Sequence, residues 1–318
     1  MNTLILEGKE YAPRAVKMYR TFGSVYFWDE LKGAKKKAIE ASTGIVVVGL
    51  KYHLDKKFLA QFPRLNIIAT PTTGLNHIDD EAAKERNIKV ISLRGHTSFL
   101  SKIPSTAEET FGLIFGVMRH FPWAFDDVKR GNWDRELWKG NQLIGKTIGI
   151  VGCGRLGKIV AKYAHAFDME VIGYDPHVAE AELKKFGIRK VNLETLLKKS
   201  DIVSLHVLLT KETENMFTRK HFKMMKPSAC FINTARAEIV ERDALITALN
   251  KKWIRAAAVD VLRDERGDGS HLKKDPLWKY AKENTNLLIA PHIGGATYEA
   301  MEVTRDFIAE EVAKHLNA

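Results

Sequence analysis

The sequence predicts an α/β protein of two domains, each built on a parallel sheet. Three observations lead to this class. Short apolar runs alternate with longer amphipathic stretches over most of the chain, which is the pattern of β-α units. A glycine-rich turn joins one apolar run to a helical stretch near the middle of the sequence. The length of 318 residues exceeds what one hydrophobic core usually supports.

Strands of the first domain are predicted at residues 44–49, 65–70 and 88–92, with a helix at 79–86 before the last of them. Residues 104–109 open the apolar-periodic run 111–119, and Ser105 or Thr106 is expected to act as its N-cap. This helix marks the expected domain border. A loop rich in tryptophan is expected after it, around Trp123, Trp133 and Trp138.

The second series of strand and helix units runs from the strand at 147–151 to about residue 290. The last helix, from about 299 to 316, has apolar residues at helical spacing. If this last helix folds back onto the first domain, that domain is discontinuous in sequence. We therefore expect one domain of residues 1–103 plus 298–318 and a second domain of residues 104–297.

The overall composition is that of a folded protein, with 45% hydrophobic and 28% charged residues and no run approaching the roughly 18 apolar residues of a membrane span. The apolar start at residues 1–8 is too short for a signal peptide core and is better interpreted as a first strand. Cys153 and Cys230 lie in apolar runs, so neither a disulfide framework nor a zinc site is expected. The cytoplasm is the expected compartment.

The net charge of +11 raises the question of a nucleic-acid partner. The lysines fall in short groups without interleaved aromatic residues, at 35–37, 184–185, 198–199 and 273–274. Solvated surfaces explain such groups, so neither a nucleic acid nor a membrane is expected as a partner. The positive field would speed the encounter with anionic ligands.

The glycine-rich turn has the G-x-G-x-x-G spacing, with Gly152, Gly154 and Gly157 between a buried-strand run and a helix. Such glycines allow a tight turn, close approach of a pyrophosphate and close packing of helix on strand. The next predicted strand, 170–174, ends at Asp175, whose carboxylate suits a ribose and would repel a 2′-phosphate. An ordinary glycine turn is the alternative, but the strand, the helix and Asp175 favour a Rossmann unit that binds NAD.

Polar residues also follow three further apolar runs, in the segments 231–236, 256–265 and 288–295. Their order, together with the glycine turn, resembles the D-isomer-specific 2-hydroxy-acid dehydrogenase family over nearly the whole chain. The resemblance implies two Rossmann/flavodoxin-like β-α-β domains with the active site in the interdomain cleft. It also implies an oxidoreductase that moves a hydride between NAD(H) and C2 of a D-2-hydroxy acid or 2-oxo acid.

The resemblance assigns a catalytic role to three residues of these segments. Arg236, in the N-x-[AS]-R motif, would clamp the substrate carboxylate and polarise the 2-oxo group, for which its rigid fork of donors is suited. His292, in P-H-I-G-G, would be the acid-base that gives or takes the hydroxyl proton. Glu265 would hydrogen-bond the imidazole and favour its protonated form.

The remaining contacts follow from the same resemblance. Asp260 is expected on the nicotinamide carboxamide, and Thr73 and Gly74 on the substrate carboxylate together with Arg236 and His292. The first domain would be the substrate-binding domain and the second the NAD-binding domain, in a homodimer. No metal is expected. The expected cofactor contacts are Thr106, Gly152, Gly154, Arg155, Leu156, Gly157, Asp175, His206, Thr213, Thr234, Ala235, Asp260 and Gly294.

The chain departs from the family pattern at several places. Ala237 stands where the family usually has glycine after the arginine, and Asn76 and His77 replace the more usual Asp-Asn pair. The loop 93–102 is rich in polar and cationic groups, which suggests a phosphorylated or polyhydroxy acid, although a solvated loop explains it as well. No role follows for the charged stretch 263–283. The polar residues of the loop are Arg94, Ser98, Ser101 and Lys102.

A non-enzymatic NAD-sensing module that binds a protein partner is the main alternative, because relatives of that kind share the fold. The presence of Arg236, Glu265 and His292 favours catalysis instead. A formate-oxidising enzyme is disfavoured, because that branch carries Gln at the position of Glu265.

Overall fold

The computed structural model describes residues 1–8 and 11–317, and the chain divides into two compact units. Unit 1 comprises Met1–Leu100, Arg266–Ser270 and Thr297–Ala318, and unit 2 comprises Ser101–Glu265 and His271–Ala296. Each unit has one sheet in which every strand pair is parallel, which confirms the predicted α/β class.

The sheet of unit 1 has the strand order β2-β1-β3-β4-β5, the order of flavodoxin-like folds. Its inner strands are apolar on both faces, as expected for a parallel sheet covered by helices on both sides. The elements of unit 1 are β1 (Asn2–Ile5), α1 (Pro13–Arg20), β2 (Val25–Phe27), η1 (Trp28–Glu30), α2 (Gly33–Ser42), β3 (Thr43–Val47), α3 (Lys56–Leu59), β4 (Ile67–Thr70), α4 (Asp80–Glu85), β5 (Lys89–Ser92), α5 (Thr97–Leu100) and α14 (Tyr298–Asn317).

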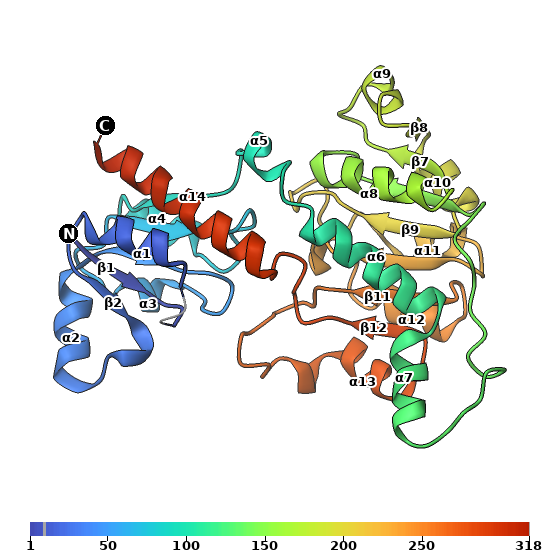
Figure 1. Cartoon of the computed structure of the whole chain (residues 1–318), viewed down its shortest axis with the longest axis horizontal. Coiled ribbons are helices and arrows are strands. Elements are labelled where there is room, and N and C mark those ends of the chain that lie inside the picture. Colours follow the sequence, from blue (N-terminus) through green and yellow to red (C-terminus); the bar gives the residue numbers. More distant parts are fainter. Residues whose placement is uncertain (9–10, 318) are drawn as a thin grey trace. The chain divides into compact units, whose positions relative to one another are not determined.

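Two parts of unit 1 come from the second half of the chain. Helix α14 packs beside α1 although the two lie at opposite ends of the sequence, and Arg14 and Glu310 form an ion pair of 2.6 Å between them (Figure 1). The segment Arg266–Ser270 also belongs to unit 1, although the sequence analysis placed it in the second domain. A β-carbon at Gly267 would lie 2.6 Å from the Lys51 carbonyl oxygen, so the glycine permits this close packing.

The sheet of unit 2 has the order β12-β11-β10-β9-β6-β7-β8, which is the Rossmann order with one added strand. Apolar clusters cover both of its faces. The elements of unit 2 are α6 (Ser105–Met118), α7 (Phe121–Lys129), β6 (Thr147–Val151), α8 (Arg155–Ala166), β7 (Glu170–Tyr174), α9 (Glu180–Lys184), β8 (Arg189–Lys190), α10 (Leu193–Lys199), β9 (Ile202–Leu205), α11 (Arg219–Met224), β10 (Cys230–Asn233), η2 (Ala237–Ile239), α12 (Ala244–Asn250), β11 (Ala256–Val259), η3 (Leu272–Lys274), α13 (Pro276–Glu283) and β12 (Leu287–Ile289).

The register of this sheet aligns the carboxyl ends of its central strands. Val151 pairs with Tyr174 on one side and with Leu205 on the other, and Asn233 pairs with both Leu205 and Val259. The residues that directly follow these strands therefore meet at one edge of the sheet. Open α/β sheets bind their ligands at this edge.

Two local predictions were wrong. Helix α6 begins at Ser105 with Pro104 in the N-cap position, and no side chain caps it. The Pro104 carbonyl accepts from the amides of Ala107 and Glu108, so the hydrogen bonds of the helix begin at Pro104, before Thr106. Trp123, predicted in a loop, lies in α7, where proline at the start of the helix favours the helical conformation.

Cys153 and Cys230 are both buried free thiols. Over residues 1–8 and 11–317, no helix is long and apolar enough to cross a membrane.

Candidate active site

The three glycines of the turn after β6 differ in the space beside them. Neighbouring atoms occupy that space at Gly152 and Gly157, and it is open at Gly154. Gly152 has φ +92°, and a β-carbon there would lie 2.7 Å from the Val207 nitrogen. A β-carbon at Gly157 would lie 2.3 Å from the Gly152 carbonyl oxygen. At Gly154 nothing lies within 4 Å of that position. Packing thus requires two of the glycines, and the third opens the backbone to a ligand.

Helix α8 begins directly after this open glycine, so its first amides point toward the same space. Leu156 packs into the apolar cluster below the helix, and the Arg155 Nη1 donates to the Ile103 carbonyl at 3.1 Å. Burial lowers the pKa of Arg155. A helix N-terminus and the open space beside Gly154 form a place that fits the pyrophosphate of a dinucleotide.

Asp175 follows β7 and is held by two backbone amides. Its Oδ2 accepts from the Cys153 nitrogen and its Oδ1 from the His177 nitrogen, both at 2.9 Å. Each carboxylate oxygen has a further lone pair. The carboxylate therefore has a fixed position beside the glycine turn, where it can accept from ribose hydroxyls.

His206 follows β9 and lies against Gly152. Its Nε2 bonds the Ser204 hydroxyl at 2.8 Å, and its Nδ1 is buried without a partner. Burial lowers the pKa of His206 to about 3, so the ring is neutral at physiological pH. Thr213 lies farther along the same loop, where its hydroxyl accepts from the Thr210 nitrogen at 2.8 Å and shapes the loop itself.

Arg236 is presented by a turn that Asn233 organises. The Asn233 Oδ1 accepts from the Ala235 nitrogen and its Nδ2 donates to the Arg236 carbonyl, each at 3.0 Å. The neighbouring Thr234 hydroxyl lies 3.1 Å from that of Thr110 on α6. Asn233 was not among the predicted site residues. The available signal was an amide at the end of an apolar strand.

His292 and Glu265 are brought together over 27 residues of sequence. The His292 Nδ1 lies 2.5 Å from the Glu265 Oε2, and the Glu265 Oε1 accepts from the Leu262 nitrogen at 2.6 Å. His292 itself has φ +55°, in the left-handed region. The pair fixes the orientation of the imidazole. Among the described residues, the His292 Nε2 has no hydrogen-bond partner.

Asp260 holds the loop that carries this histidine. Its backbone carbonyl accepts from the His292 nitrogen at 2.9 Å, its Oδ1 from the Ile293 nitrogen at 2.7 Å and its Oδ2 from the Gly294 nitrogen at 2.9 Å. Asp260 is only 1% exposed. A β-carbon at Gly294 would lie 3.0 Å from the Thr106 Cγ2, so α6 packs directly on this loop.

Thr73 and Gly74 lie in unit 1, in the turn between β4 and α4. The Thr72 hydroxyl donates to the Gly74 carbonyl at 2.8 Å, and the Leu93 nitrogen donates to the Thr72 carbonyl at 3.0 Å. These bonds fix the shape of the turn. The predicted catalytic and cofactor-binding residues all lie in unit 2, whereas the loop 93–102 is divided between the two units.

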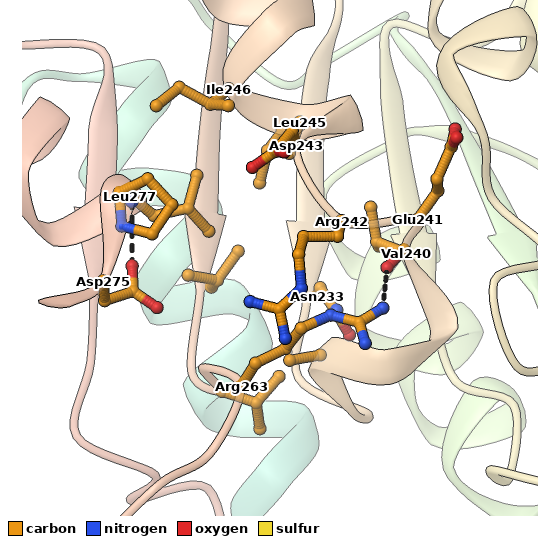
Figure 2. A pocket seen from close by; sticks show the side chains of 14 residues that line it. Asn233, Val240, Glu241, Arg242, Asp243, Leu245, Ile246, Arg263, Asp275 and Leu277 are labelled. Atoms are coloured by element: carbon orange, nitrogen blue, oxygen red, sulfur yellow. Dashed lines mark hydrogen bonds between the residues drawn. The ribbon is translucent and has the colours of Figure 1, made fainter. Parts of the chain in front are cut away.

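A hollow of about 520 Å³, including its open mouth, lies in unit 2 beside α12 and α13, and its lining includes Asn233 (Figure 2). Two of its polar side chains are engaged within the protein: Arg263 donates to the Val240 carbonyl at 2.6 Å, and the Asp275 Oδ1 accepts from the Leu277 nitrogen at 2.8 Å (Figure 2). In the part of the chain that is described, no three His, Cys, Asp or Glu side chains gather as metal ligands.

Comparison with known proteins identifies the family of this chain. Residues 111–294 match the model described as "D-isomer specific 2-hydroxyacid dehydrogenase, NAD binding domain". The chain is 37% identical to a glyoxylate reductase of Thermococcus litoralis over 98% of this chain and 91% of that protein. It is 35% identical to a D-3-phosphoglycerate dehydrogenase of Methanocaldococcus jannaschii over 88% of this chain, but spans only 51% of that longer protein.

Among solved structures, the D-lactate dehydrogenase of Aquifex aeolicus complexed with NAD and lactic acid is similar over 100% of this chain and 96% of its own. The TM-score is 0.79 and the sequence identity 27%. The similarity thus extends over both units of the chain.

Proposed function

The chain belongs to the D-isomer specific 2-hydroxyacid dehydrogenase family, and on that premise we propose that Arg236, Glu265 and His292 carry its reaction. The protein is an NAD-dependent oxidoreductase that interconverts a D-2-hydroxy acid and its 2-oxo acid. NAD, when bound, supplies the hydride chemistry. The side chains of the protein bind the acid and move the proton.

His292 is proposed as the acid-base, and the 2.5 Å contact with Glu265 is the observation that carries this proposal. Because the Nδ1 side faces a carboxylate, Nε2 is the atom from which His292 gives a proton to the 2-oxo oxygen in reduction. In oxidation the same atom takes the proton from the hydroxyl. Glu265 stabilises the positive charge on the ring in the protonated state.

Arg236 is proposed to bind the substrate carboxylate and to polarise the 2-oxo group. Its planar guanidinium can form two parallel hydrogen bonds to a carboxylate, which a lysine cannot. Support comes from Asn233, whose side chain bonds both the Ala235 nitrogen and the Arg236 carbonyl and so fixes the backbone that presents Arg236. Thr73 and Gly74 of unit 1 are also proposed to contact the substrate carboxylate.

The glycine turn, the α8 N-terminus and Asp175 are proposed to hold NAD, with Asp260, Gly294 and Thr106 nearest the nicotinamide. Arg155, Leu156, His206, Thr213, Thr234 and Ala235 complete the proposed contacts. On the same basis, unit 2 is proposed as the NAD-binding domain and unit 1 as the substrate-binding domain, with borders near residues 103 and 298.

Asp175→Ala is expected to lower kcat/KM for NADH about 10- to 100-fold, the effect of losing charge-assisted hydrogen bonds. Use of NADPH should fall much less, because the repulsion of a 2′-phosphate is removed as well. The measurement is the ratio of the two kcat/KM values. Glu170→Ala, an exposed acid at the other end of β7, is the control. An unchanged ratio in Asp175→Ala would count against the ribose role.

The substrate is proposed to be a phosphorylated or polyhydroxy acid. Arg94 and Lys102 are exposed cationic groups, and a relative is named a D-3-phosphoglycerate dehydrogenase. NADH consumption with glyoxylate, hydroxypyruvate, phosphohydroxypyruvate and longer sugar-derived 2-oxo acids tests this. The highest kcat/KM is expected with a phosphorylated or polyhydroxy acid. Equal values for short acids without such groups would dismiss the idea.

A cytoplasmic homodimer is also proposed. The two buried free thiols fit a reducing compartment. Exposed apolar side chains follow α6 along the chain, as expected of a surface covered by a second copy, and light scattering in solution should give twice the chain mass. These side chains are Phe125, Val128, Trp133, Leu137 and Ile144.

The non-enzymatic NAD-sensing alternative has no support from the comparisons, because the relatives described above are named as reductases and dehydrogenases. NADH consumption with any 2-oxo acid distinguishes the two functions.

A further inference from the structure

A second carboxyl group lies beside the proposed nicotinamide contact. Glu109 stands in the second turn of α6, and both of its carboxyl oxygens are buried and accept no hydrogen bond from a donor group. An ionised carboxylate is costly in such a place, whereas a neutral carboxylic acid is not. Glu109 was not predicted as a site residue, because one more acidic side chain near the start of a helix is common.

The Glu109 and Asp260 side chains both approach Gly294. A β-carbon at Gly294 would lie 2.5 Å from the Glu109 Oε2 and 3.1 Å from the Asp260 Oδ2. The two carboxyl groups are thus neighbours across the loop that carries His292. Two neighbouring buried carboxylates do not both ionise readily, so they share a proton.

Hydrogen bonding decides which of the two carries the proton. Asp260 accepts two backbone N–H bonds, which stabilise a negative charge, whereas Glu109 accepts none. Burial, and after it the negative charge of Asp260, raises the pKa of Glu109 to about 8. Glu109 is therefore the protonated partner at neutral pH, and its proton can be donated to Asp260.

The other titratable groups around the pair do not compensate a second negative charge. Glu108 on α6 is exposed and lies 3.5 Å from the Tyr163 hydroxyl of α8, and the His292 ring is paired with Glu265. Thr234, at the end of β10, is uncharged. No cationic side chain among the described residues forms a salt bridge with either Glu109 or Asp260.

We propose that Glu109 sets the preference of this enzyme between the two redox states of its cofactor. As a neutral acid it leaves the pair with one negative charge, which suits the uncharged ring of NADH. Once ionised, it gives the pair two negative charges, which favour the cationic ring of NAD⁺. The proton leaves to solvent. The proposal rests on the proposed function, in which Asp260 lies at the nicotinamide.

The relative affinity for NAD⁺ and NADH should depend on pH. Glu109 loses its proton as the pH rises through about 8, so the affinity for NAD⁺ should increase relative to that for NADH over this range. If the pKa of Glu109 is one unit lower in the NAD⁺ complex than in the NADH complex, the affinity ratio changes about 10-fold.

The test is a binding measurement on the intact chain. The Kd of NADH is measured by its fluorescence and the Kd of NAD⁺ by calorimetry, at several pH values on both sides of 8. In the wild type, the ratio of the NAD⁺ Kd to the NADH Kd should fall about 10-fold with rising pH. In Glu109→Gln, which cannot ionise, the ratio should stay constant. Glu108→Gln, the exposed neighbour, should behave as the wild type.

Calorimetry of the wild type in buffers of different ionisation enthalpy adds a readout that needs no variant: NAD⁺ binding should release about 0.4 of a proton at pH 8, and NADH binding should release none. A ratio that does not change with pH in the wild type, or the same change in Glu109→Gln, would overturn the role of Glu109. Absence of NADH binding at every pH would instead overturn the cofactor site and the proposed function with it.

Discussion

His292→Ala is expected to lower kcat/KM for reduction of the 2-oxo acid about 100-fold or more, the usual loss when an acid-base group is removed. Without the imidazole, the oxygen that gains negative charge during reduction has no proton donor held in place by Glu265. The measurement is the initial rate of NADH consumption. NADH binding, followed separately, should stay within a few-fold of the wild type, because the cofactor contacts proposed here lie on other residues.

His315→Ala is the matched control, since this histidine is exposed on α14 in unit 1. It should leave kcat/KM unchanged. A rate near that of the wild type in His292→Ala would refute the acid-base assignment.

Arg236→Ala is expected to cost about 2–4 kcal/mol of transition-state stabilisation, comparable with the loss of a donor to an oxyanion. KM for the acid should rise as well, because the ground-state contact with the carboxylate is lost. Arg236→Lys should recover only part of the loss, because an ammonium lacks the two-donor fork. Steady-state rates with varied acid and saturating NADH give both constants.

Arg242→Ala removes an arginine that was not predicted to contact substrate or cofactor and serves as the control, with little effect expected (Figure 2). If Arg236→Ala kept the wild-type KM and kcat, the carboxylate clamp would have to be sought elsewhere.

Much of the fold could be predicted because parallel strands buried on both faces are continuous apolar runs in sequence. The runs that end at Val151, Tyr174, Asn233 and Val259 are visible without a structure. Since parallel strands align their carboxyl ends, the polar residues that follow these runs had to meet at one edge. That the motif residues lie at one edge of the sheet could therefore be predicted from the sequence.

Residues that act through a tertiary neighbour could not be found in this way. Glu109 differs from any other helical acid only because Asp260 and Gly294 pack against it, and they lie more than 150 residues farther along the chain. The N-cap of α6 was misplaced because serine and threonine are good caps by preference, whereas here the chain enters the helix at Pro104.

If the His292–Glu265 pair and Arg236 carry a D-2-hydroxy-acid dehydrogenase reaction, the product itself has to show it. The purified chain is incubated with NADH and hydroxypyruvate, beside His292→Ala, and the amount and configuration of the hydroxy acid formed are determined. We expect one equivalent of the D-isomer for each NADH consumed, and only background with the variant. NADH binding without consumption of any 2-oxo acid, or formation of the L-isomer, would contradict the account.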